Sequence, residues 1–188
     1  MDDDLDGELL AAVGLGNDED SRAALAEIGS TPVPLDLFRR LRVRLDTLLP
    51  KSVDPGFVLR SLQRFIAASR SPTALLALFE RDDRALATLL RVLGAGERMT
   101  RWLVADPESF DLVRASDGAE ASRETLVDEI VAELETLSLH RSDPEAASRV
   151  LRSVFGRERL RIAYADFVGQ VTPTRVAAQL SILADAII

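Results

Sequence analysis

Apolar residues recur at spacings of three and four along most of this chain, which is the period of an α-helix. The pattern follows Asp54, Asp106 and Thr172, and further helices are predicted over residues 35–49, 84–93, 98–104 and 123–137. No segment alternates apolar and polar residues with the period of a β-strand. Asp117-Gly118 lies between two helical patterns, so it is predicted to be a helix–helix loop. The expected fold is all-α, a bundle of many helices.

Helix starts are marked by a repeated dipeptide. Asp, Ser or Thr caps a helix and Pro fits the first turn, where its missing N–H is not needed. We predict capped starts at six such pairs: Thr31-Pro32, Asp54-Pro55, Ser71-Pro72, Asp106-Pro107, Asp143-Pro144 and Thr172-Pro173. No internal repeat of solenoid length is visible.

The first 30 residues differ from the rest, because eight acidic residues precede the first basic residue, Arg22. This composition predicts a partly disordered acidic leader over residues 1–30 and one helical domain over residues 31–188. A docking tail for a basic partner is the alternative interpretation of the leader.

Charge and composition exclude several functions. The net charge of −8 opposes nucleic-acid binding, which needs a surplus of Lys and Arg. The chain has no cysteine and one histidine, so it cannot form a thiolate or histidine zinc centre. The start "MDDDLDGELL" is not a signal peptide, and no apolar run is long enough to span a membrane. We expect a cytoplasmic protein.

No residue set resembles an active site. The glycine-rich stretches "VGLGNDED" and "LGAGERM" lack the lysine of a phosphate loop and suit helix ends. His140 lies in the polar stretch "SLHRSDP" and is expected to be an exposed residue near a helix end. Neighbouring carboxylates such as Asp82-Asp83 are typical of solvated helix faces. We therefore predict no catalytic, cofactor-binding or metal-binding residue in this chain.

The stretch "LRSVFGRERLRIAYADFVG", residues 151–169, concentrates four arginines in one helical pattern. Glu158 falls within its apolar stripe if Gly156 does not break the helix, and a buried carboxylate needs a partner. Arg161 is one turn away, Arg157 is adjacent, and Asp166 is a candidate acceptor. We predict a structural or interface ion-pair network of Arg157, Glu158, Arg161 and Asp166, with a ligand-binding cluster as the alternative.

The same stretch belongs to a longer resemblance. Residues 157–188, "RERLRIAYADFVGQVTPTRVAAQLSILADAII", resemble the segment that precedes a nucleotidyltransferase domain in the bacterial glutamine synthetase adenylyltransferase/adenylyl-removing enzymes, the glutamate-ammonia-ligase adenylyltransferases. The residues that match are Leu151, Arg152, Arg157, Glu158, Leu160, Arg161, Ile162, Ala163, Asp166, Leu183, Ala184, Asp185 and Ala186. The family's basic F-K-R-R-E is replaced by Val154-Phe155-Gly156-Arg157-Glu158, so a role that needs the full basic cluster is in doubt.

A second block, residues 71–113, is similar to the family's helix pair before an R-D-P-E motif. Here the matching residues are Phe79, Glu80, Arg81, Leu93, Gly94, Leu103, Asp106, Pro107, Glu108 and Asp111. Together the two blocks extend the resemblance over about residues 54–188.

The resemblance implies a function for the parent protein. The family's catalytic S-D-x-D motif, whose aspartates hold magnesium, occurs nowhere in this sequence. The chain is thus expected to be a helical N-terminal fragment, inactive alone, of a bifunctional enzyme that adenylylates and deadenylylates glutamine synthetase in nitrogen metabolism. For the full-length enzyme the resemblance implies magnesium and ATP or phosphate as cofactors. Its implied partners are glutamine synthetase, a PII-type signalling protein and an adjacent nucleotidyltransferase domain. The alternative is a stand-alone helical scaffold that binds a protein partner.

Overall fold

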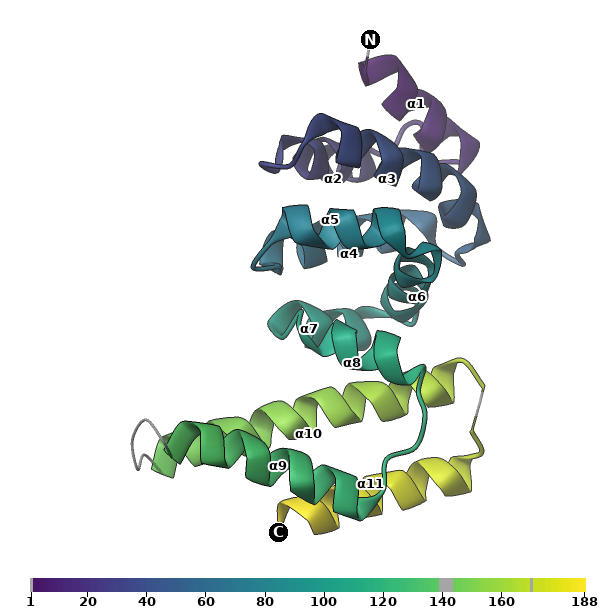
Figure 1. Ribbon diagram of the computed structural model, residues 1–188. Coiled ribbons are helices and arrows are strands. Elements are labelled where there is room, and N and C mark those ends of the chain that lie inside the picture. Colours follow the sequence, from purple (N-terminus) through teal and green to yellow (C-terminus); the bar gives the residue numbers. More distant parts are fainter. Residues whose placement is uncertain (1, 139–143, 170) are drawn as a thin grey trace. The chain divides into compact units, whose positions relative to one another are not determined.

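The computed structural model describes residues 2–138, 144–169 and 171–188. Within these ranges the chain forms helices and turns and no strand, so the all-α prediction is confirmed (Figure 1). The helices are α1 (Asp2–Ala12), α2 (Glu19–Ser30), α3 (Leu35–Leu48), the 3-10 helix η1 (Leu49–Lys51), α4 (Pro55–Ala68), α5 (Pro72–Arg81), α6 (Asp83–Gly94), α7 (Glu97–Ala105), α8 (Ser109–Ser116), α9 (Arg123–Ser138), α10 (Pro144–Phe167) and α11 (Pro173–Ile187). None of the described helices is both long and apolar enough to cross a membrane.

Three of the predicted caps are confirmed by side-chain hydrogen bonds. Asp54 accepts from the N–H of Phe57 at 2.9 Å, Ser71 caps α5 in the same way, and Thr172 caps α11. A cap that the dipeptide pattern misses is Asp82, which accepts from the first N–H groups of α6.

Two predicted starts are wrong. The N–H of Thr31 donates to Ile28 O, so Thr31 completes the end of α2, and α3 begins only after Pro34. Likewise the N–H of Asp106 donates to Trp102 O and ends α7. Closing one helix does not by itself prevent a residue from capping the next, since Asp82 both ends α5 and caps α6. The two predicted starts are wrong because α3 and α8 begin only at Leu35 and Ser109. For the sixth pair, α10 begins at Pro144, while Asp143 lies outside the described residues, as does His140.

The chain divides into two compact units, Met1–Glu108 and Ser109–Ile188, which we call unit 1 and unit 2. The boundary differs from the expected division at residue 30. Helix α2 falls within the expected leader, yet Ala24, Leu25 and Ile28 on it are buried and it packs against α4. Helix α2 is therefore part of the core of unit 1, although the many acidic residues of the predicted leader suggest an exposed segment.

Unit 1 is a stack of helix pairs. Helix α2 packs on α4, α3 packs on α5, and α4 packs in turn on α6 and α7 (Figure 1). Gly29 of α2 allows the close approach of α3, because a Cβ there would lie 3.0 Å from the ring of Phe38. These helices stack in layers (Figure 1), and their sequence shows no internal repeat. Their largest fully buried side chains include Leu25, Ile28, Leu45, Leu49, Leu59, Leu62, Phe65, Ile66 and Phe79.

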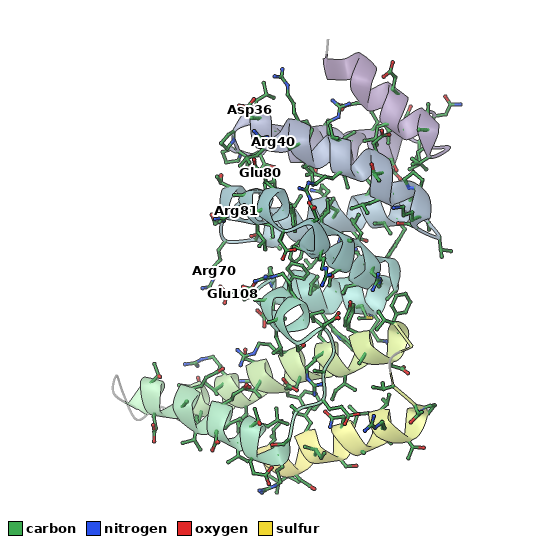
Figure 2. All side chains as sticks on the ribbon, turned by 45° about the vertical axis from the view of Figure 1, so that its right-hand side comes forward. Asp36, Arg40, Arg70, Glu80, Arg81 and Glu108 are labelled. Atoms are coloured by element: carbon green, nitrogen blue, oxygen red, sulfur yellow. The ribbon has the colours of Figure 1, made fainter. Side chains whose placement is uncertain are left out.

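Ion pairs lie along the outside of this stack. Figure 2 labels charged residues on one edge of unit 1, where Arg40 pairs with Glu80 and Arg70 lies 2.7 Å from Glu108. The last pair is 85% and 58% exposed, and pairs this exposed add little to the free energy of unfolding.

Unit 2 is built around α10, its longest helix. Helix α10 packs against α8, α9 and α11, and α11 also packs against α9. Leu126, Ile162 and Leu183, one from each of α9, α10 and α11, form a buried apolar cluster. The predicted loop at Asp117-Gly118 is confirmed, and both residues have positive φ angles of 49° and 78°. Helix α10 continues through Gly156 without a break.

Candidate functional site

The arginine-rich part of α10 contains a buried ion pair. Glu158 and Arg161 are each 2% exposed, and Arg161 Nε donates to Glu158 Oε2 at 2.8 Å. The two residues are three apart in the helix, so their side chains lie on the same face. That face turns inward because Val154, Ile162 and Ala165, its apolar residues, are buried.

Arg161 also reaches two segments outside α10. Its Nη1 donates to the backbone oxygen of Ala119, in the link between α8 and α9. Its Nη2 donates to Gln179 Oε1 at 2.9 Å, on α11. One guanidinium group therefore holds the helix that carries it, the preceding link and the following helix.

Gln179 completes the arrangement with a pair of backbone bonds. The N–H of Ala121 donates to Gln179 Oε1 at 3.0 Å, and Gln179 Nε2 donates to Ala121 O at 3.2 Å. We call Glu158, Arg161, Gln179 and the backbone of Ala119 and Ala121 the Arg161 cluster. Tyr164, fully buried one turn further along α10, donates to Asp117 Oδ1 at 3.2 Å and fixes the start of the same link.

The other two residues of the predicted network lie elsewhere. Arg157 pairs with Glu133 of α9 and not with Glu158. Asp166 is exposed and pairs with no arginine in the part of the chain that the structure describes. Asp166 is five residues beyond Arg161, about 140° around the helix, so it points away from the buried face. Phe155, an apolar residue of the same stretch, is 40% exposed, and the Arg159 guanidinium carbon lies over its ring, 5.3 Å from the ring centroid.

The sequence pattern of residues 151–169 does not indicate which residues outside this stretch bind Arg161. Gln179 and the link residues lie 18 to 58 positions away from the groups they bind. The sequence does hold one signal, because Gln179 is a polar residue at helical spacing from the apolar residues Val176 and Leu183. A polar residue on a buried face needs a partner.

The charges of the cluster act on the pKa of one carboxyl group of α9, that of Glu129. Removal from water raises the pKa of the Glu129 carboxyl on α9, and the negative charge of Glu158 raises it further. Arg157 and Arg161 act in the opposite direction. For the pKa of Glu129, burial and the neighbouring carboxylates therefore outweigh the two arginines.

The bonds of Arg161 decide what the cluster can do chemically. Arg161 is 2% exposed and all three of its guanidinium nitrogens donate to protein oxygens, so the group is not open to a phosphate or a nucleotide from solvent. The cluster positions helices. Among the described residues no group of three His, Cys, Asp or Glu side chains is placed to hold a metal ion.

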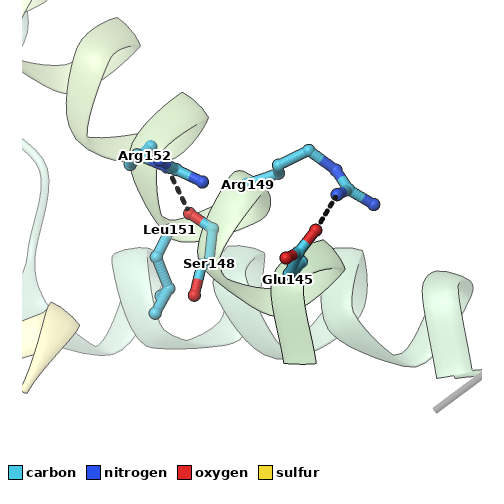
Figure 3. Close-up of a pocket in the computed structure, with 5 residues that line it drawn as sticks. All are labelled: Glu145, Ser148, Arg149, Leu151 and Arg152. Carbon is cyan, nitrogen blue, oxygen red and sulfur yellow. Dashed lines mark hydrogen bonds and ion pairs between the residues drawn. The ribbon is translucent and has the colours of Figure 1, made fainter. Parts of the chain in front are cut away.

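Two surface hollows offer no better binding site. A hollow of about 730 Å³ lies along the first turns of α10, lined by Glu145, Ser148, Arg149, Leu151 and Arg152 (Figure 3). Arg149 pairs there with Glu145 at 3.9 Å, and Arg152 Nε donates to Ser148 O at 3.1 Å. A second hollow of about 460 Å³ lies between α1 and α3 and is lined by both charges and apolar groups.

Comparison with known proteins gives a family match. The model of the family "Glutamate-ammonia ligase adenylyltransferase" matches residues 86–188, from α6 to the end of α11. A "Bifunctional glutamine synthetase adenylyltransferase/adenylyl-removing enzyme" of Xanthomonas axonopodis pv. citri is 28% identical over 194 residues. Proteins of the same description from two strains of Xanthomonas campestris pv. campestris are also 28% identical, over 192 residues.

These alignments cover nearly all of this chain but a small part of the relatives. They include 98% of the chain for the first relative and 97% for the other two, and 20% of each relative's own length. No solved structure matches.

Proposed function

The chain belongs to the glutamate-ammonia ligase adenylyltransferase family, and we propose that it is the helical N-terminal part of an enzyme that adenylylates and deadenylylates glutamine synthetase. The family match over residues 86–188 carries this proposal. The relatives align along nearly the whole chain, which supports the same assignment for unit 1.

Within that enzyme, this chain has a positioning role. Its described residues hold no metal site, and the Arg161 guanidinium is buried and bonded to three protein segments. Catalysis belongs to a nucleotidyltransferase domain in the same polypeptide, which uses magnesium with ATP or phosphate. Unit 2 gives that domain a firm helical support, because the Arg161 cluster joins α10, α11 and the α8–α9 link.

Recognition of other proteins is assigned to unit 1. Stacked helix pairs present broad surfaces that commonly bind proteins, and unit 1 has this arrangement from α2 to α7. Glutamine synthetase is the proposed partner, with a PII-type signalling protein as a second one. The cytoplasm, where ATP is available, is the proposed location.

The experiment is an activity comparison between two lengths of the gene product. One is residues 1–188, and the other extends by roughly 250 further residues, an ordinary domain length. Each is incubated with adenylylated glutamine synthetase, magnesium and phosphate, and release of AMP or ADP is followed. We expect release by the extended protein and none by residues 1–188. A third sample, with the aspartates of the S-D-x-D motif replaced by asparagine, controls for contaminating activity.

A stand-alone scaffold is the second candidate, and the stacked helix pairs of unit 1 favour it. It predicts a stop codon directly after Ile188, which would overturn the proposed function. Release by neither protein, with an open reading frame that continues, would also count against the deadenylylating role.

A further inference from the structure

Helix α11 has an unusual exposed surface. Its exposed positions between residues 176 and 184 are Ala177, Ala178, Leu180, Ser181 and Ala184, and none is charged. By contrast, α9 in the same unit exposes Arg123, Glu124, Asp128, Glu129 and Glu135. A helix with one face in water carries charged and polar residues there, whereas a helix that is apolar all round is a buried helix. Residues 176–184 of α11 have the composition of a buried helix, and the exposed charged residues Arg175 and Asp185 lie at the two ends of this segment.

The buried side of α11 fixes which residues face outward. Leu183 is 0% exposed in the apolar cluster of unit 2, and Gln179 is held by Arg161 and Ala121. On the other side, Ala177, Leu180, Ser181 and Ala184 follow one another at spacings of one to three and lie on one face. We call these four residues the outer stripe. Leu180, its largest member, is 42% exposed.

We propose that the outer stripe is the contact surface for the segment of the same polypeptide that follows α11. This inference rests on the proposed function, in which a nucleotidyltransferase domain follows the helical part. In the matched relatives, the region aligned with this chain is only 20% of the protein, so most of their length is available to supply such a contact.

The size of the stripe favours a contact within one polypeptide over a second copy of the chain. A stable dimer buries about 800 Å² on each partner, from about 20–30 residues. Four residues, two of them alanine, provide a small fraction of that area. A directly connected segment needs much less, because the connection gives it a local concentration of about millimolar.

The absence of cysteine from this chain makes the contact measurable. Ala184→Cys places a thiol in the outer stripe, and Leu180→Cys is a second variant there. Ala132→Cys places one on the exposed face of α9 as the matched control. Each variant is prepared as residues 1–188 and as the extended protein. Its modification by a maleimide is timed by mass spectrometry of the labelled peptide, after circular dichroism has shown native helix content.

We expect all three thiols to react at similar rates in residues 1–188. In the extended protein, Ala184→Cys and Leu180→Cys should react about tenfold more slowly or slower still, because a covered thiol reacts only when the contact opens. Ala132→Cys should keep its rate. Equal rates at position 184 in the two proteins would overturn the proposal. Protection in residues 1–188 that increases with protein concentration would also overturn it, because a second copy would then cover the stripe.

The same samples separate this inference from the proposed function. AMP or ADP release with no protection of the stripe would leave the function standing and reject the contact. Protection without release would establish the contact and count against the deadenylylating role. A stop codon after Ile188 would reject both.

Discussion

Arg161 shows how the position of a charge decides its effect on stability. It is almost fully buried, and each of its three nitrogens donates to a named oxygen. Arg70, by contrast, is paired with Glu108 in water. A buried charge that loses its partner keeps its desolvation cost, whereas an exposed one regains water. The two pairs should therefore respond very differently to the loss of their glutamates.

Replacing Glu158 with alanine is expected to lower the free energy of unfolding by about 3 kcal/mol, because Arg161 stays buried without its carboxylate. Glu108→Ala is the matched control and should change it by less than about 0.5 kcal/mol. Urea melting of both variants measures the difference. A near-zero effect of Glu158→Ala would contradict the buried pair.

Replacing Gln179 with leucine tests the contacts that reach α11. Leucine is similar in size to glutamine, but it leaves the N–H of Ala121 and Nη2 of Arg161 without their acceptor. We expect a loss of about 1–3 kcal/mol, the cost of unsatisfied buried groups. Gln63→Leu on α4, which removes an exposed hydrogen bond to Glu27 of α2, should cost less than about 0.5 kcal/mol. Thermal melts give both values, and equal losses would mean that burial is irrelevant here.

From the sequence, members of this cluster can be predicted only when they lie on the same helix. Glu158 and Arg161 can be paired because both lie on one predicted helix face, three residues apart. Gln179 cannot be added, because the rotation of α11 that brings it to Arg161 depends on how Leu183 packs. The charge of Asp166 makes it a candidate acceptor, but the helical period places it on another face of α10 from Arg161.

At the scale of elements, similar dipeptides can either cap the start of a helix or follow the end of the previous one. Asp54-Pro55 and Thr31-Pro32 look alike in the sequence, but only Asp54 accepts a hydrogen bond from the helix that follows. The hydroxyl of Thr31 donates backwards to Glu27 O at 3.2 Å. The dipeptide predicts a cap correctly only where the previous helix has already ended.

The difference can be measured with two substitutions. Asp54→Ala should lower the free energy of unfolding by about 1 kcal/mol, the usual contribution of an N-cap. Thr31→Ala should change it by less than about 0.5 kcal/mol, because its exposed hydroxyl caps no helix start. Chemical denaturation of the two variants side by side checks this. Similar losses would restore Thr31 as a cap.

The start of α2 carries a carboxylate whose protonation should matter. The hydrogen bond from the Ser21 hydroxyl lowers the pKa of Asp18 below its usual value, and the charge of Arg60 adds to this. A carboxylate with a lowered folded-state pKa stabilises the protein above its unfolded-state pKa of about 4, and this contribution is lost as the pH falls through the folded-state value.

We therefore expect Asp18→Asn to be less stable than the wild type at neutral pH, with a difference that shrinks as the solution is acidified below about pH 4. Urea midpoints measured across this pH range provide the test. If the difference in stability did not depend on pH, the charge of Asp18 would not be the source of its stabilising effect.

At the scale of the whole molecule, the helical content follows from the sequence, but the division into two units does not. The apolar period determines the helices, and the lack of strand patterns excludes sheets. The division falls at Glu108, within a three-residue connection that has no linker composition. Helix α2 packs into unit 1 through three buried apolar residues, although the segment that contains it is rich in charged residues.

The division into two compact units predicts a local loss of stability when one of them is altered. The Glu158→Ala substitution weakens a cluster that lies entirely in unit 2. We expect the amide protons of α10 and α11 to exchange faster in this variant, while those of α4 change less, because local openings follow local contacts. Hydrogen exchange followed by mass spectrometry checks this, and equal acceleration in α4 would show that the units unfold together.

The stacking of helix pairs in unit 1 has a consequence for how the chain reaches this structure. Side-chain bonds between its layers join residues only 33 to 42 positions apart. Each layer has its partners as soon as the next helix pair has been synthesised, so unit 1 can fold in the order in which it leaves the ribosome.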